Sequence, residues 1–218
     1  MNFGEIMLSK LKAKYTLTQN DLKENALLKK SGMKFALKSW EVQGLGHFFI
    51  MDMSGMMGLM KMETVILAAE TKKVPLFNLD YVKAMGNETL MAEYYNVAED
   101  TVPEPYAAAF DEIRSADASL EDYASGSHWY DPYLLPFTYR KKGKKQAAHF
   151  MDVAGKEIDL FLKLIDEAET CDPAQRKEST RFFAQSLLDQ GGPAVDQFTK
   201  LFGRDTAEKV VREYMYGV

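Results

Sequence analysis

The sequence predicts an α+β protein built as a three-layer α/β/α sandwich with a central, largely antiparallel sheet. Residues 33–97 consist of short apolar or alternating runs separated by glycine, which is typical of an antiparallel meander. From residue 105 onward the runs are longer and have helical period. A sheet of about five or six strands followed by a block of helices favours a sandwich with the sheet in the middle. Since no repeat or linker divides the chain, we expect a single domain over residues 1–218.

The N-terminal half supplies the predicted sheet. Residues 4–14 predict a short amphipathic helix, and Asn20-Asp21 begins a helical turn that runs to Leu28. Gly55 to Gly58 predicts a hairpin turn, although the methionine-rich stretch 50–62 also fits a helix. The expected strands span residues 33–43, 46–53, 59–69, 74–82 and 89–97.

The C-terminal half supplies most of the helices. Asp172-Pro173 is a strong start signal, because aspartate caps a helix and proline suits its first position. The segment 128–139 is aromatic and extended, and a basic turn follows at 140–145. The expected helices span residues 106–122, 147–170, 173–190 and 195–202, with a last one capped by Asp205 and running through Tyr214.

Composition excludes several classes of function. The net charge is −5, which gives no support to nucleic-acid binding. The lone Cys171 fits a reducing compartment, and no run approaches the ~20 apolar residues of a membrane span. No basic region followed by an apolar run opens the sequence, so we expect a cytoplasmic protein without membrane contact. The three histidines show no ligand spacing, and we expect no metal.

Three acidic residues fall within the apolar strand region: Asp52, Glu63 and Asp80. If they share a buried face, desolvation and mutual repulsion raise the pKa of at least one of them. A carboxylic acid that is still protonated near neutral pH can deliver a proton to a substrate. Alternatively, the three acids point to water or pair with nearby lysines, and spacing alone favours this second interpretation.

Two further segments can face a ligand. His128 and Trp129 lie in the aromatic stretch, where a ligand contact and a structural role both remain open. The basic run that contains Arg140 and Lys142 either is solvated, attracts an acidic protein or holds the carboxylates of a ligand. No Gly-x-Gly-x-x-Gly, Walker or Gly-x-Ser-x-Gly pattern occurs, so nucleotide binding and serine hydrolysis lack their usual motifs.

Residues 75–82, Pro-Leu-Phe-Asn-Leu-Asp-Tyr-Val, resemble a motif of the ferredoxin-dependent bilin reductases. That family carries a Pro-apolar-Phe-Gly-x-Asp-apolar-Val segment whose aspartate is the central proton donor, and Asp80 occupies its place. Residues 201–216 are similar to the family's closing Phe-Gly-x-x-x-Ala-Glu helix and its aromatic finish. The resemblance covers roughly residues 35–216. Glu63 stands where the phycocyanobilin-forming members carry histidine, and Asn78 stands where the family carries glycine.

The resemblance implies a mechanism. An open-chain tetrapyrrole such as biliverdin lies between the sheet and the C-terminal helices, with His128, Trp129, Arg140 and Lys142 as substrate contacts. Single electrons arrive from an acidic protein, a ferredoxin or flavodoxin, and the enzyme holds no bound cofactor. Asp80 protonates the pyrrole system, while the remaining catalytic acids, Glu63 and Asp52, hold or relay protons. Two alternatives stay open: a tetrapyrrole carrier without turnover, and a small-molecule-binding or assembly protein whose acids lie at the surface.

Overall fold

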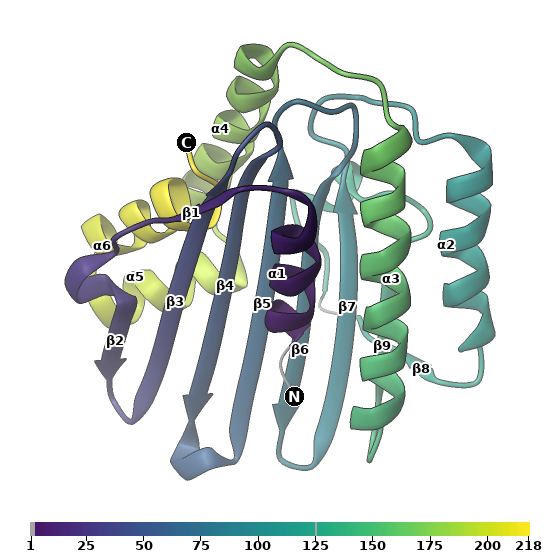
Figure 1. The fold of residues 1–218 in the computed structure, drawn as a ribbon. Coiled ribbons are helices and arrows are strands. Elements are labelled where there is room, and N and C mark those ends of the chain that lie inside the picture. The colour runs from purple at the N-terminus through teal and green to yellow at the C-terminus, as the bar shows by residue number, and fades with distance from the viewer. Residues whose placement is uncertain (1–2, 125) are drawn as a thin grey trace.

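The computed structural model describes residues 3–124 and 126–218, and it contains one large antiparallel sheet (Figure 1). Within these residues the strand order is β1-β3-β4-β5-β6-β7-β9-β8, and β2 pairs with β3 outside this path. The strands are β1 (Leu17–Gln19), β2 (Leu27–Lys30), β3 (Met33–Val42), β4 (Gly46–Gly55), β5 (Met60–Ala69), β6 (Leu76–Ala84), β7 (Asn87–Tyr95), β8 (Glu121–Asp122) and β9 (Tyr139–Gly143).

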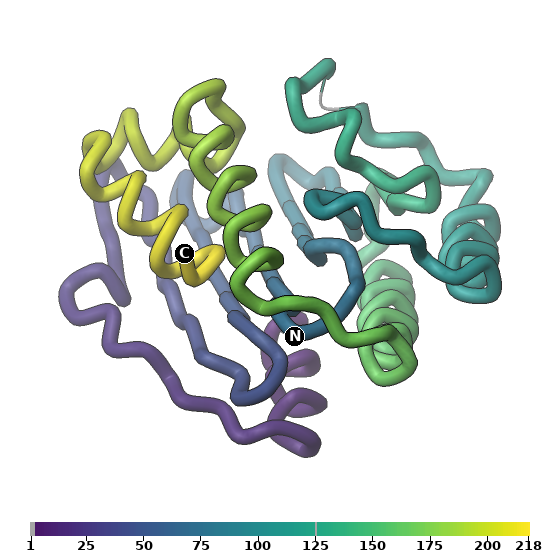
Figure 2. The backbone as a smooth tube through the Cα atoms, turned by 90° about the horizontal axis from the view of Figure 1, so that it is seen from above, coloured from purple at the N-terminus to yellow at the C-terminus, as the bar shows by residue number. Residues whose placement is uncertain are grey.

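Helices cover both faces of this sheet (Figures 1 and 2). One face packs against α1 (Phe3–Lys14), α2 (Glu104–Ala116) and α3 (Ala147–Glu167). The other packs against α4 (Pro173–Gln190), α5 (Pro193–Phe202) and α6 (Arg204–Lys209), which continues as a π-helical segment, Val210–Met215. The chain is therefore an α+β three-layer sandwich, as its sequence predicts.

Two separate hydrophobic cores result, because successive side chains of a strand point to opposite faces. On the first face, Phe77 of β6 stacks on Phe161 of α3 with ring centroids 4.7 Å apart. On the second face, Phe35 of β3 contacts Phe198 of α5 at 4.9 Å. The parity of a residue in the central strands therefore decides which of the two faces its side chain lies on.

The pairing of the strands decides which polar side chains meet. Asp52 of β4 lies opposite Glu63 of β5, whereas Asp80 of β6 lies opposite Thr64, one residue further along β5. Directly opposed residues share a face, and neighbours in sequence do not. Asp80 is thus on the face covered by α4–α6, and the other two acids are on the face covered by α1.

Most predicted elements are confirmed, including the five meander strands, the helix at residues 4–14 and the start of α4 at Asp172, whose side chain accepts from the Ala174 amide at 2.9 Å. The expected helical turn at 20–28 is only a 3₁₀ turn at Lys23–Ala26, followed by strand β2.

Three predictions in the C-terminal half are wrong. The helix at 106–122 ends at Ala116, because residues 121–122 pair with β9 instead. The basic turn at 140–145 is largely strand β9, which hydrogen-bonds to β7 and alternates its basic side chains between the two faces. The cap of α6 is Gly203, at φ 91°, rather than Asp205, which already lies inside the helix.

Among the described helices, none is both long and apolar enough to cross a membrane. In the same residues, no group of three or more histidine, cysteine, aspartate or glutamate side chains is arranged to hold a metal ion.

Candidate functional site

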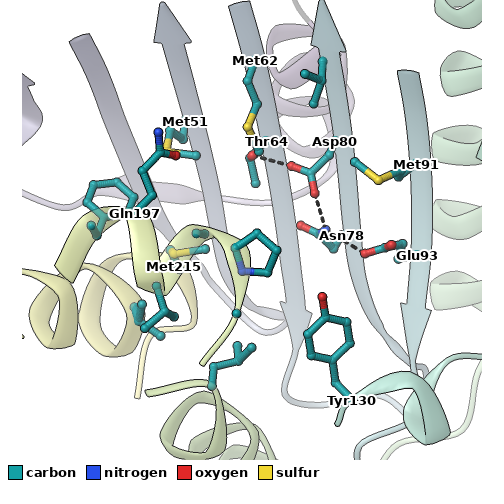
Figure 3. A pocket seen from close by; sticks show the side chains of 18 of the residues that line it. Met51, Met62, Thr64, Asn78, Asp80, Met91, Glu93, Tyr130, Gln197 and Met215 are labelled. Carbon is teal, nitrogen blue, oxygen red and sulfur yellow. Dashed lines mark hydrogen bonds between the residues drawn. The ribbon is translucent and has the colours of Figure 1, made fainter. Parts of the chain in front are cut away.

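A cavity of about 320 Å³ lies between the sheet and the α4–α6 layer (Figure 3). Its walls are mainly methionine and aromatic side chains, and a few polar groups from β5, β6, β7 and β9 converge at its floor. Such a combination is typical of sites for flat, largely apolar ligands. The lining includes Phe35, Met51, Met60, Met62, Thr64, Asn78, Asp80, Met91, Glu93, Tyr95, Tyr130, Arg140, Phe183, Gln197, Phe198, Met215 and Tyr216.

Asp80 lies at the floor of this cavity and is mostly buried. The Thr64 hydroxyl donates to Oδ1 of Asp80, and the Asn78 amide donates to Oδ2 at 2.8 Å. Burial and, to a lesser extent, the charge of Glu93 raise the pKa of Asp80 to about 6, although the two donors oppose this rise. Asp80 can therefore carry a proton close to neutral pH.

Glu93 and Arg140 form an ion pair beside Asp80. Arg140 donates to Oε1 of Glu93 from Nε at 2.7 Å and from Nη2 at 2.6 Å. Oε2 of Glu93 accepts from the Tyr95 hydroxyl at 2.5 Å and from the Asn78 amide at 3.4 Å. Asn78 thus bridges the two carboxyl groups, and a continuous polar chain runs from Asp80 to Arg140.

Tyrosines complete the polar part of the cavity. The hydroxyl of Tyr130 points into it from the segment after β8 (Figure 3), and Tyr216 lines it from the C-terminal end. Burial first, and then the charge of Glu93, raises the pKa of Tyr130 to about 12. The pKa of Tyr216 is raised well above its usual value, mainly by burial and then by Asp80. Both phenols therefore stay neutral near pH 7.

The structure does not bring the three predicted acids together. Asp52 and Glu63 lie on the opposite face of the sheet from Asp80. Oε1 of Glu63 accepts from the Gly4 amide at 2.6 Å, at the start of α1, where a carboxylate complements the helix dipole. Burial raises the pKa of Glu63 to about 7, against the hydrogen bonds from the backbone of α1. Neither acid lines the cavity.

Two predicted substrate contacts lie one layer behind the cavity wall. The Trp129 indole donates to the Gly191 carbonyl at 2.8 Å and packs against Phe183 with centroids 5.7 Å apart. The His128 ring stacks on Tyr130 at 4.8 Å, with the rings 7° from parallel. Both side chains support lining residues, and neither lines the cavity itself.

The two predicted basic contacts also differ. Arg140 lines the cavity, as described above. Lys142, two residues further along the same face of β9, pairs with Glu121 at 2.8 Å and lies outside the lining.

Sequence reasoning missed Thr64, Asn78, Glu93 and Tyr95, although two signals were present. Asn78 precedes Asp80 by two residues, so any strand places both on one face. Glu93 and Tyr95 have the same spacing on the next strand. The missing information was the register between these strands, which is set by the geometry of the hairpin turns.

Comparison with solved structures shows the same fold in phytochromobilin synthase from tomato, in a structure with biliverdin. The TM-score is 0.73, the sequence identity is 12%, and the match covers 98% of this chain and 81% of that chain. No family model and no curated protein matches the sequence. At 12% identity, the similarity shows a shared fold and no more.

Proposed function

We propose that this protein binds an open-chain tetrapyrrole such as biliverdin in the cavity and reduces it by proton-coupled single-electron transfers. The observation that carries the proposal is Asp80, a mostly buried acid with a pKa of about 6 in a cavity walled by methionine and aromatic side chains. The shared fold with a biliverdin-bound protein and the motif around Asp80 both support this substrate class.

The chemistry follows from charge. An electron added to a tetrapyrrole in a low-dielectric cavity creates a negative charge that is costly to leave uncompensated. The Asp80 carboxyl donates its proton to the reduced pyrrole system, so that electron and proton together add one hydrogen, and the resulting carboxylate takes a proton back from solvent. Two such cycles reduce one double bond. In this proposal Arg140 meets a propionate, whereas the role of Asp52 and Glu63 as proton relays has no support in the geometry.

The electrons come, in this proposal, from an external acidic protein of the ferredoxin or flavodoxin type. One end of the sheet is suited to contact such a partner. It is formed by the turns β2–β3, β4–β5 and β6–β7 and by the turn after β9, and we call it the hairpin end. Met57 and Met85 are 101% and 72% exposed there, and the Met85 amide donates to the Leu59 carbonyl at 3.3 Å, so the two turns lie side by side. The exposed lysines at this end are Lys29, Lys30, Lys34, Lys61, Lys83, Lys144 and Lys145.

The protein as a whole has a net charge of −5, so a group of exposed lysines around apolar side chains is a local basic surface. Such a surface attracts an acidic partner. The hairpin end also adjoins the cavity, because the cavity is lined by Met60, the first residue of β5, and by Val82, two residues before the end of β6. A Met57→Glu variant should weaken the response to the donor without changing biliverdin binding. Phe182→Glu is the matched control, since Phe182 is 64% exposed on α4, away from the turns.

One observation favours a second candidate, a tetrapyrrole carrier without turnover. The cavity holds Asp80 and an already paired Glu93, while the other two acids lie across the sheet. A carrier needs the cavity and not a supply of protons.

The first test is the absorption spectrum of biliverdin mixed with the protein. We expect a red-shifted band of the protonated bilin that is lost in Asp80→Asn and kept in Asp52→Asn, whose side chain lies on the other face. A band unaffected by Asp80→Asn removes this acid from the proposal, and no spectral change at micromolar protein removes tetrapyrrole binding altogether.

Anaerobic addition of reduced ferredoxin to the complex then separates the two candidates. Bleaching of the bilin band in the native protein, with no bleaching in Asp80→Asn, identifies a reductase. A stable band in both proteins identifies a carrier.

A further inference from the structure

The cavity holds one positive charge that is already neutralised. Among the described lining residues, Arg140 is the only arginine or lysine, and both of its contacts at 2.6–2.7 Å go to Oε1 of Glu93. At pH 7 the Asp80 carboxyl, with its pKa of about 6, is mostly ionised as well, so the cluster holds one cation and two carboxylates before a ligand carboxylate reaches Arg140. Its arrival adds a further negative charge next to side chains that are mostly buried.

The two acids of this cluster are unequally supported. Glu93 accepts two hydrogen bonds from the Arg140 guanidinium, one from the Tyr95 hydroxyl and one from the Asn78 amide. Asp80 accepts only from two neutral donors, Thr64 and Asn78. Hydrogen bonds from charged donors stabilise a carboxylate more than those from neutral donors do. When the pair must take up one proton, Asp80 is the group that receives it.

No other charged group in the described part of the cavity can absorb the surplus. The remaining lining side chains near Asp80 and Glu93 are phenols, amides, hydroxyls or apolar groups. The raised pKa values of the buried tyrosines keep those side chains neutral near pH 7. The other polar side chains that line the cavity are Thr64 from β5, Asn78 from β6, Tyr95 from β7, Arg140 from β9, Tyr123 and Tyr130 from the segment before β9, Gln197 from α5 and Tyr216 from the C-terminal end.

We infer that Glu93 is a positioning residue that couples the capture of a ligand carboxylate by Arg140 to the protonation of Asp80. In the free protein the guanidinium neutralises Glu93. In the complex the ligand carboxylate shares or replaces that contact, so the charge of Glu93 is no longer neutralised. Glu93 lies next to Asp80, with Asn78 between them, and its charge then disfavours the ionised form of Asp80. One proton moves from solvent to Asp80, and the proton donor is loaded when a carboxylate-bearing tetrapyrrole is bound. This inference rests on the proposed function.

The experiment measures proton uptake on ligand binding at pH 7 in weak buffer with an indicator dye. Biliverdin, which has two propionate groups, is compared with its dimethyl ester, which has no carboxylate. Proton uptake by the ester reports protonation of the bilin itself, and the difference between the two ligands reports the carboxylate. At pH 7, above the Asp80 pKa of about 6, we expect biliverdin to take up about one proton more than the ester.

The variants separate electrostatic coupling from structural support. Glu93→Gln should abolish the difference between the two ligands, because a ligand carboxylate then only neutralises the free Arg140. Glu93→Asp, which keeps the charge, should restore at least part of the difference. Lys142→Gln is the control on the same face of β9, and it should behave as the native protein, since Lys142 pairs with Glu121 outside the cavity.

A measurement on the free protein tests the coupling between Glu93, Arg140 and Asp80 independently of the ligand. The pKa of Asp80 is measured by NMR titration of the carboxyl ¹³C resonances, and the Asp80 resonance is the one that is lost in Asp80→Asn. We expect this pKa to fall in Glu93→Gln and to rise in Arg140→Gln. Opposite or absent shifts overturn the inference, because they remove the coupling between these side chains.

The outcomes also separate this inference from the function on which it rests. If biliverdin causes no spectral change, the proposed function fails and the inference falls with it. If the bilin band forms but biliverdin and its ester take up equal numbers of protons, or if Glu93→Gln keeps the difference, the inference alone is overturned.

Discussion

Asp80→Asn should stabilise the folded protein at neutral and alkaline pH. The pKa of Asp80 rises from 3.8 to about 6 on folding, chiefly through burial. An acid with a raised pKa binds its proton more tightly in the folded state than in the unfolded state. Its contribution to the free energy of unfolding is therefore fully present below pH 3.8 and is lost as the pH rises through about 6. At pH 8 the ionised side chain costs about 3 kcal/mol, at 1.36 kcal/mol for each tenfold change in acidity.

The asparagine variant removes this cost but loses one hydrogen bond. Its amide cannot accept from both Thr64 and Asn78 as the carboxylate does, and a lost hydrogen bond costs about 1 kcal/mol. The net gain at pH 8 is therefore about 2 kcal/mol, and the difference between the two proteins should grow by about 1.4 kcal/mol from pH 5 to pH 8.

Urea denaturation of both proteins across that pH range measures the effect. Asp152→Asn is the control: Asp152 is exposed, and the hydrogen bond from Lys156 holds its pKa below the usual value, so this variant should show no gain. If Asp80→Asn is less stable than the native protein at pH 8, or if the difference does not change with pH, then folding does not raise the pKa of Asp80, and Asp80 is not the proton donor proposed above.

Three further predictions concern the framework around the site. Gly46→Ala should cost more than about 3 kcal/mol of unfolding free energy, because a Cβ at Gly46 falls 2.1 Å from the Ala68 carbonyl oxygen. Arg176→Ala should cost about 3–5 kcal/mol in thermal or urea unfolding, since it leaves Asp100, 10% exposed, without its ion-pair partner. Glu157→Gln should gain stability over the native protein as the pH rises from 5 to 9, because burial raises the pKa of Glu157 to about 8.

The first two of these variants each have a matched comparison. Gly44→Ala leaves the new Cβ in open space at φ 77°, so it should cost about 1 kcal/mol and clearly less than Gly46→Ala. Lys156→Ala breaks an exposed pair and should cost under about 1 kcal/mol. Equal costs within either pair contradict the packing on which these predictions depend, and a pH-independent effect of Glu157→Gln contradicts the buried acid.

Sequence patterns predicted the layers of this fold because each layer has its own hydrophobic period. The apolar stripe of α3 and the Asp172-Pro173 start of α4 are local signals, and the structure confirms both. Strand β9 was missed because its sequence, Tyr-Arg-Lys-Lys-Gly, is too polar to predict a strand. It forms because the edge of β7 offers backbone partners and because Arg140 and Lys141 find carboxylates on opposite faces.

The site was predicted only in part, because strand register is not a local property. Alternation separates Glu63 from Thr64, but only the pairing of β5 with β6 shows that Asp80 joins Thr64. A shift of one residue in the hairpins would reverse this assignment. The resemblance singled out Asp80 independently of register, whereas Glu93 could be found only once β6, β7 and β9 were aligned.

The most direct test of the central claim is a crystal structure of the protein with biliverdin. We expect a bilin lying between the sheet and α5, with an Asp80 carboxyl oxygen within hydrogen-bond distance of a pyrrole nitrogen and a propionate on Arg140. A bilin bound on the face covered by α1 and α3, or bound in the cavity with Asp80 turned away from every pyrrole nitrogen, contradicts this claim.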